Sequence, residues 1–512
     1  MDFIQGVSRN QLFMMQLDDY VAQDSWARVV DVFVNALPLQ KLGFKNTLAK
    51  EGRPPFDAKD LLKLYLYGYK NGLRSSRKLE HACTVNIEIM WLLNGLMPSA
   101  RAIAYFRKNN ATAFKNAFRH FVGILKELNL IDGQTIAIDS FKIRAQNALK
   151  NNFNQKKIDR HIQYIDTKIN EYQNQLDNED NTELGQQIET KIEYQKSKKK
   201  AYQKIESKLK ESEQAQISLT DTDARSVVLH RNIINVGYCV QAGCDAKYKL
   251  FINNDTGTVN DTNALSPMAL DAKKLLQLDT MNVITDKGYT TAQHIQICTN
   301  NNITTFSSPK NHASQNNGLF AMNTFDYNQK EDSYICPNNK KLSTNGTTYK
   351  KRNHRVKHYK NRKACQHCAL RNQCTKNKSG RIIERGIYQQ ALEENEKRVN
   401  QNPDYYRLRQ QITEHQFGTI KRQWGFTHTL MRGKENVLSE VNLIMMCYNL
   451  KRIMSILTPQ VVLQYFEKFV LKIIRYTSYF KTIYRPIFFK IKKHPSLYSY
   501  FKTPTYKLNL HY

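Results

Sequence analysis

The chain has 512 residues, of which 77 are Lys or Arg and 45 are Asp or Glu, so its formal charge is +32 at pH 7. Its apolar content of 41% reaches the lower end of ordinary globular composition, and a disordered chain is not expected. So large a positive excess repels itself unless a polyanion neutralises it. The charge therefore favours nucleic acid as the partner, ranks an anionic membrane surface second and disfavours a small-molecule enzyme.

The sequence predicts a cytoplasmic protein that does not enter a membrane. The N-terminus MDFIQGVSRN lacks the basic region and apolar core of a secretory signal, and the chain has no apolar run of about 18 residues. Nine cysteines in a chain of this length do not make a disulfide framework. We therefore interpret cysteine clusters as metal ligands or as packing.

Residues 1–130 are predicted to form a helical N-terminal DNA-binding domain. Apolar residues recur at spacings of three and four in DAKDLLKLYLYGYKNGLRSSRKLEHAC, which is typical of helices. Gly72 breaks this stretch, and the helix after it begins among Arg74, Arg77 and Lys78. A tight turn followed by a basic helix fits a helix-turn-helix DNA reader. An ordinary helical bundle with a solvated basic face is an equal alternative.

Residues 151–216 are predicted to form a helical hairpin inserted into the next domain. Isoleucines at spacings of three and four, from Ile158 to Ile169, mark its first helix, and the pattern resumes from Leu184. The segment balances 12 basic against 12 acidic residues and contains no residue pattern that suggests chemistry. A structural or dimerising role is the expectation.

From residue 217 the sequence contains short runs of β-forming residues that alternate with helical stretches. This alternation predicts an α/β layer. Two strands end in carboxylates: Asp139 follows Ile136 and Ile138 in TIAIDSFKIRA, and Asp286 ends MNVITD before a glycine turn. Carboxylates at strand ends face the crevice in which α/β proteins bind ligands. A third acid, Glu414, lies in the helical stretch RLRQQITEHQFGTIKRQWGF.

Basic residues flank Glu414 at helical spacing. Lys421 lies two turns after it and Arg407 two turns before it, so in a continuous helix all three share one face. Three carboxylates beside such cations suit two-metal phosphodiester cleavage, in which oxygen ligands hold Mg²⁺ or Mn²⁺. For any single aspartate, a turn or a helix cap is the commoner explanation.

The strings AIDSFKIRA, ITDKGYTTAQHI and ITEHQFGTIKRQWGFTHTLMRGKENV, followed by YNLKRI, resemble the motifs of bacterial insertion-sequence transposases with a DDE triad. RPPFDAKDLLKLYLYGY and ARAIAYFRK are similar to the N-terminal transposase domain of that family. The resemblance spans about residues 10–455. It implies an RNase H-like mixed sheet flanked by helices over residues 131–455, interrupted by the insertions at 151–216 and 331–386.

Carried over by position, the resemblance makes Asp139, Asp286 and Glu414 the catalytic ligands of Mg²⁺ or Mn²⁺. It makes Lys421 a phosphate contact. Lys287 and Arg407 are also expected to bind DNA phosphates. Related signatures often have an arginine four residues before the glutamate, where this chain has a glutamine. Arg407 or Arg409 could take that role. Three further aspartates are competing candidates for metal ligation: Asp221, Asp223 and Asp245. The simpler interpretation is that they cap strands or turns.

The segment 331–386 is predicted to be loop-like and strongly basic, with 15 basic against 3 acidic residues. Its basic residues are expected to contact DNA phosphates without reading sequence. Four thiols in this segment could bind a structural Zn²⁺, and free thiols in a folded insert are an equal alternative. The four candidate ligands are Cys336, Cys365, Cys368 and Cys374.

Residues 456–512 are predicted to be a basic, aromatic C-terminal tail that could bind nucleic acid or an anionic surface. The family resemblance does not reach this segment, so an extension without a selected role is the alternative.

The resemblance implies a bacterial DNA transposase, associated with the nucleoid, that acts on the terminal inverted repeats of its own element and on target DNA. Two element ends in one complex imply at least a homodimer. The alternatives are an RNase H-like nuclease that cuts without joining and a non-catalytic DNA-binding protein derived from a transposase.

Overall fold

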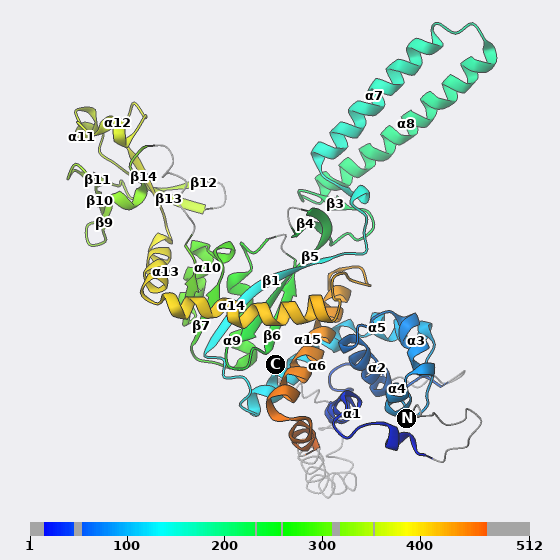
Figure 1. Ribbon diagram of the computed structural model, residues 1–512. Coiled ribbons are helices and arrows are strands. Elements are labelled where there is room, and N and C mark those ends of the chain that lie inside the picture. The colour runs from blue at the N-terminus through cyan, green and yellow to red at the C-terminus, as the bar shows by residue number, and fades with distance from the viewer. Residues whose placement is uncertain are drawn as a thin grey trace, which may run out of the picture.

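The computed structural model describes residues 15–45, 54–230, 233–257, 260–309, 318–351 and 354–467. Figure 1 shows a central sheet with helices packed around it, a long helical hairpin and a small sheet that both project from this body. The mixed α/β class predicted from the sequence is confirmed. No helix among the described residues is both long and apolar enough to cross a membrane.

The N-terminal part of the described chain is helical, as predicted. Short polar residues begin several of these helices: the side chains of Ser25, Asp57, Ser75 and Ser99 each accept a backbone N–H of the first turn. The helices are α1 (Trp26–Ala36), α2 (Ala58–Lys70), α3 (Ser76–Val85), α4 (Ile87–Leu92), α5 (Ala100–Asn109) and α6 (Ala111–Glu127).

The central sheet runs in the order β4, β5, β1, β7 and β8, with β6 also paired to β5. Strands β1, β7 and β8 are parallel, whereas β4, β5 and β6 pair antiparallel. The strands are β1 (Thr135–Arg144), β4 (Arg225–His230), β5 (Ile233–Asp245), β6 (Phe251–Thr256), β7 (Met281–Thr285) and β8 (Ile303–Ser307). The helices that follow or flank them are α9 (Leu265–Leu276), α10 (Ala292–Asn300), α13 (Gln389–Gln401), α14 (Pro403–Gly418) and α15 (Lys434–Leu457).

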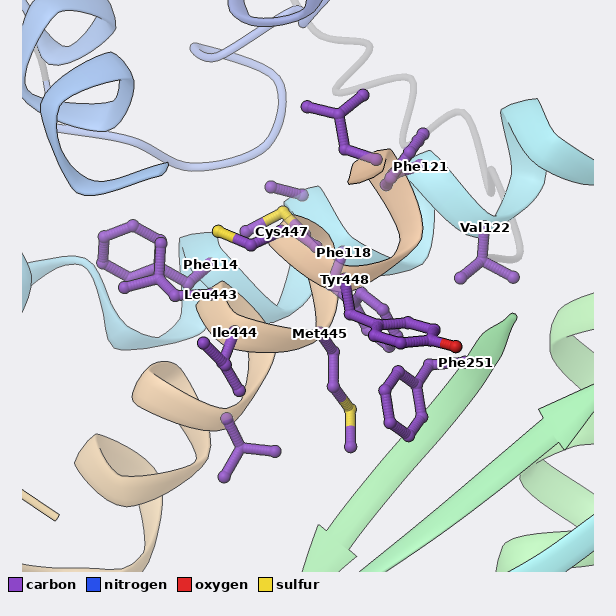
Figure 2. Packing of buried hydrophobic residues seen from close by; sticks show 14 of the residues in the cluster. Phe114, Phe118, Phe121, Val122, Phe251, Leu443, Ile444, Met445, Cys447 and Tyr448 are labelled. Carbon is purple, nitrogen blue, oxygen red and sulfur yellow. The ribbon is translucent and has the colours of Figure 1, made fainter. Parts of the chain in front are cut away.

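One continuous hydrophobic core joins the N-terminal helices to the sheet. Helix α15 is buried on nearly every side and lies between α6 and the strands (Figure 2). Its Tyr448 ring packs edge to face against Phe251 of β6, with 5.1 Å between centroids, and its Asn449 bonds both backbone groups of Phe251. A helix that is apolar all round is stable only as an interior helix. The predicted N-terminal segment therefore has no separate core.

The hairpin predicted within residues 151–216 consists of α7 (Gln155–Leu176) and α8 (Thr182–Glu211), which extend away from the sheet in Figure 1. Its own small core contains Ile165 and Ile169 from one helix and Ile188 and Ile192 from the other. At its base, the short strands β2 (Asn152–Phe153) and β3 (Ile217–Ser218) pair with each other and close the insertion.

The prediction that residues 331–386 are loop-like is wrong, because this segment folds into most of a second, antiparallel sheet. The sheet consists of β9 (Asp326–Asn328), β10 (Ser333–Ile335), β11 (Lys341–Ser343), β12 (Thr348–Lys351), β13 (His354–Lys360) and β14 (Ile382–Gly386), joined by α11 (Arg362–Gln366) and α12 (Arg371–Cys374). Its core includes Tyr334 and Tyr359, whose rings lie 5.1 Å apart. Most of the predicted tail, from residue 468 onward, lies outside the described residues.

Candidate active site

Two carboxylates start from neighbouring positions on adjacent parallel strands. Ile138 of β1 lies opposite Thr285 of β7, and Asp139 and Asp286 are the next residue of each chain segment. Parallel strands lie about 4.8 Å apart, so the two aspartates occupy neighbouring positions. The prediction that Asp139 ends its strand is wrong, because β1 continues to Arg144 and pairs with β5 over that length. Asp286 ends its strand and begins the turn η3 (Lys287–Tyr289), where its Oδ1 accepts the Lys287 N–H at 2.7 Å.

Helix α14 packs against β1 and β7 and carries the third acid, Glu414. The Thr413 hydroxyl donates to Asp139 Oδ2 at 3.1 Å, and Arg409 Nη1 donates to the same oxygen at 2.9 Å. Glu414 is the residue after Thr413 and is exposed. The structure therefore places Asp139, Asp286 and Glu414 on three adjoining elements.

Burial raises the pKa of the Asp139 carboxyl above its ordinary value. The Ser140 N–H, the Arg409 guanidinium and the Thr413 hydroxyl oppose this rise because each favours the ionised form. A carboxylate in such a position needs a nearby positive charge to stay ionised.

The three acids fit a divalent cation in their chemistry, since hard oxygen donors are the ligands that Mg²⁺ and Mn²⁺ prefer. In the structure, however, the three carboxylates do not form a complete metal-binding site. Within the described part of the chain, no three His, Cys, Asp or Glu side chains converge closely enough to hold a metal ion. Asp139 is engaged by Arg409 instead.

A fourth acid, Asp261, lies near Asp139 and was missed from the sequence. Gln241 of β5 donates to Asp261 Oδ1 at 2.9 Å and accepts a hydrogen bond from the buried Tyr289 hydroxyl. A Cβ on Gly288 would lie 3.2 Å from Asp261 Oδ2, so the glycine permits this close approach. The network fixes the turn after Asp286. Asp261 stands in a polar stretch, NDTN, that resembles any surface loop, and no sequence signal separates it from one.

Lys421 lies near two other cations, Lys142 of β1 and Arg422. Burial lowers the pKa of Lys421, and the charges of Arg422 and Lys142 lower it further. None of the three forms an ion pair with an acid of the described chain. The predicted continuous helix is wrong here, because a π-helical turn, η6 (Thr419–Gln423), follows α14 and breaks the helical period that put Lys421 and Glu414 on one face.

The structure distinguishes between the arginines proposed from the sequence. Arg407 points away from the sheet: its side chain is 76% exposed and pairs with Asp404 of its own helix. Arg409 faces Asp139 and so takes the position that sequence reasoning left open between the two.

The basic residues at and just before the start of α3 differ in their exposure to solvent. Arg77 and Lys78 are exposed on this helix, and Lys287 is exposed beside Asp286. Arg74 is only 5% exposed, donates to the His428 carbonyl at 2.7 Å and lies over the Phe426 ring. Its guanidinium is bound inside the protein and does not present itself to DNA.

The competing aspartates have structural partners. Asp221 accepts from the Tyr238 hydroxyl and from the Gly433 N–H, and Asp223 accepts the Lys434 N–H at the start of α15. Asp245 lies opposite Ile136, towards the other end of β1 from Asp139, and accepts the backbone N–H groups of Gly133 and Lys247.

Burial raises the pKa of Asp245 to about 7, and the neighbouring Asp132 adds to the rise. Between about pH 4 and 7 the folded chain therefore holds a proton that the unfolded chain has released, and the free energy of unfolding falls as pH rises. Asp245→Asn removes this titration. Denaturant unfolding should show the variant gaining on the wild type from pH 4 to 7, by up to about 1.4 kcal/mol per pH unit. A difference that does not change with pH would contradict the raised pKa.

The four cysteines of the second sheet gather at one end of it. The Lys340 N–H lies 3.4 Å from Cys336 Sγ, and Asn338 of the same turn lies 3.5 Å from Cys368 Sγ. Burial raises the pKa of the Cys374 thiol, and the other three cysteines add to the rise against the charge of Arg381. The thiols do not converge closely enough to form a metal site in the described structure, so the zinc site stays a prediction.

Comparison with known families places the molecule in the class of transposases. Residues 15–109 match a family described as a transposase domain, and residues 335–454 match a family described as the transposase DDE domain. Both matches are to transposase families, and they confirm the resemblance to insertion-sequence DDE transposases seen in the motifs. The second match includes Glu414 but not the two aspartates.

One solved structure, a cryo-EM structure of the piggyBac transposase synaptic complex with hairpin DNA, is also similar to this chain. The two chains share 11% identity, the similarity covers 87% of this chain and 79% of the other, and the TM-score is 0.31. No curated protein matches the chain.

Proposed function

We propose that the chain binds the terminal inverted repeats of an insertion sequence, cleaves DNA at the element ends and joins the freed 3′-OH to target DNA. One observation carries this proposal: Asp139 and Asp286 each follow one residue of the pair Ile138 and Thr285 on adjacent parallel strands, and Glu414 follows the residue of α14 that contacts Asp139. Water is the nucleophile in cleavage and the 3′-OH is the nucleophile in joining.

The proposed fold of the region around these carboxylates is RNase H-like. The mixed sheet supports it, with antiparallel β5 and β6 on one side of β1 and parallel β7 and β8 on the other. In this proposal residues 131–455 form the catalytic domain, residues 1–130 grip DNA, and the hairpin and the second sheet are insertions.

Asp139, Asp286 and Glu414 would hold Mg²⁺ or Mn²⁺, and such ions, when bound, activate the attacking oxygen and stabilise the leaving oxygen. The residues of the chain contribute position and charge around them. Gln241 and Asp261 hold the turn after Asp286, and the burial of Asp139 strengthens electrostatic interactions at the reacting phosphate.

DNA is proposed to lie against the cations that lack acidic partners. Lys421, Lys142 and Arg422 form one group, because like charges gathered without a counter-ion are best neutralised by a phosphate. The exposed residues Lys287, Arg77 and Lys78 and the basic second sheet would add further backbone contacts. These contacts position DNA without reading its sequence.

Lys421→Gln is expected to weaken binding of element-end DNA several-fold and to reduce the slope of log Kd against log salt by about 1, since one phosphate contact is lost. Lys196→Gln is the matched control, because Lys196 is exposed on the charge-balanced hairpin. Fluorescence anisotropy over a salt series measures both. Equal slopes for the two variants would contradict the contact.

The proposed function also includes a structural zinc site and a homodimer. The four cysteines of the second sheet would bind one structural Zn²⁺, and less than about one equivalent of zinc in the purified chain would remove that idea. Assembly on two element ends would require at least a homodimer, for which the projecting hairpin offers a surface.

A joining assay separates the candidate functions. The full chain is incubated with Mg²⁺, a plasmid as target and a labelled DNA end that carries a free 3′-OH. A transposase makes covalent end-to-plasmid products, a nuclease cuts without making them, and a non-catalytic DNA-binding protein does neither. Cleavage without joined product would overturn the transposase proposal in favour of the nuclease.

A further inference from the structure

Arg409 forms an ion pair with Asp139, the first of the three proposed metal ligands. We propose that Arg409 acts as an internal counter-cation: it pairs with Asp139 while no divalent ion is bound, and a divalent ion must displace it to reach Oδ2 of Asp139. The inference rests on the proposed function, because it takes Asp139 to be a metal ligand. It adds a positioning residue that the triad does not contain.

Both oxygens of Asp139 are already bonded within the protein. Oδ1 accepts the Ser140 N–H at 2.8 Å, and Oδ2 accepts both Arg409 Nη1 at 2.9 Å and the Thr413 hydroxyl at 3.1 Å. A carboxylate offers about four lone-pair positions in all. With two donors on Oδ2, a cation cannot approach that oxygen unless one of them leaves.

Of these donors, Arg409 is the one that is free to leave. The Ser140 N–H belongs to the strand backbone. Thr413 is fully buried, so its hydroxyl oxygen stays beside Asp139 whether its one proton goes to Asp139 or to the Arg409 carbonyl. The Arg409 side chain is 16% exposed, and its guanidinium has no second hydrogen bond or ion pair anywhere in the described chain. It ends a long side chain that can swing towards solvent.

The ion pair also explains how the buried Asp139 carboxylate can stay ionised when no metal ion is bound. Asp139 is largely buried, and an unpaired charge there would be costly. Arg409 supplies the compensating charge and keeps the carboxylate ionised. A released Arg409 would then be a cation beside the place where phosphate is expected, and its planar fork suits phosphate oxygens. Metal entry and DNA contact are thereby coupled through one side chain.

The test measures Mn²⁺ binding to the full chain without DNA, by the electron paramagnetic resonance signal of free Mn²⁺. Arg409→Gln is expected to tighten the affinity about tenfold, because the ion no longer competes with a guanidinium. Arg407→Gln is the matched control, since Arg407 lies two residues away on the same helix but pairs with Asp404. It should leave the affinity unchanged.

Further variants separate the possible failures. Arg409→Lys keeps a charge and should give an affinity between the wild type and Arg409→Gln, and circular dichroism checks that each variant is folded. In an Asp139→Asn background, Arg409→Gln should have no effect. If Arg409→Gln leaves Mn²⁺ affinity unchanged or weakens it while Asp139→Asn abolishes binding, the competition is wrong and the metal site stands. If Asp139→Asn leaves Mn²⁺ binding intact, the proposed site and this inference both fail.

Discussion

Asp286→Asn is expected to lower DNA cleavage at element ends by at least about 10³-fold. The substitution keeps the size of the side chain and its acceptor for the Lys287 N–H, but it removes a negative charge where metal stabilisation of the transition state is worth several kcal/mol. Cleavage of a labelled end in Mg²⁺, followed over time, measures the loss. Asp139→Asn and Glu414→Gln should lose activity to a similar extent.

The matched control is Asp279→Asn, because Asp279 is exposed just before β7, at the opposite end of that strand from Asp286. DNA binding should persist in all of these variants, since removing a carboxylate reduces repulsion of phosphates. Asp223→Asn should also keep its activity, because Asp223 caps α15 rather than facing the sheet edge. Active Asp286→Asn protein together with inactive Asp223→Asn protein would show that the triad is misassigned.

The two aspartates could be found from the sequence because each one follows a short apolar run that forms a buried strand. Ile136 and Ile138 are buried in β1, and Val283 and Ile284 are buried in β7, as their spacing predicted. Such runs show that a carboxylate lies on or next to a strand, although β1 continues beyond Asp139 to Arg144. They do not show which strands are neighbours, so the closeness of Asp139 and Asp286 depended on the family resemblance.

The choice between Arg407 and Arg409 could not be made from the sequence, because it depends on how α14 is rotated about its axis over β1. Residues two positions apart on a helix point about 200° apart, and apolar spacing alone located the packed side only roughly. Lys421 shows the same limit. Its predicted direction assumed a regular helix, and the π-helical turn from Thr419 changes the number of residues per turn.

The second sheet escaped prediction because its strands are three to seven residues long and its core relies on tyrosines with polar hydroxyls. The Tyr359 hydroxyl donates to Asp332, and Arg385 Nη1 donates to the Tyr334 hydroxyl. Charged partners inside a small core make the sequence look like a solvated loop, since period-two patterning is hidden by polar residues at buried positions. The same applies to Arg74, whose burial follows from partners more than 350 residues away.

The buried partners of Arg74 also lead to a prediction about the free energy of unfolding. Glu440 of α15 is fully buried and accepts the backbone N–H groups of Leu430 and Met431. Arg74 Nη1 lies 3.9 Å from its Oε2, and burial raises the pKa of Glu440 against the opposing charges of Arg107 and Arg74. Arg107 in turn donates to the Arg74 carbonyl. One carboxylate thus compensates two buried guanidinium groups of the N-terminal helices.

Glu440→Gln is expected to lower the free energy of unfolding by about 3–5 kcal/mol, because it leaves Arg74 and Arg107 buried without a negative charge. Glu435→Gln, on an exposed position in the first turn of the same helix, should change it by less than about 0.5 kcal/mol. Denaturant unfolding followed by circular dichroism compares the two. A loss below about 1 kcal/mol for Glu440→Gln would mean that other groups neutralise the arginines. A large loss accompanied by weaker DNA binding would show that this buried charge holds α3, with Arg77 and Lys78, against the rest of the protein.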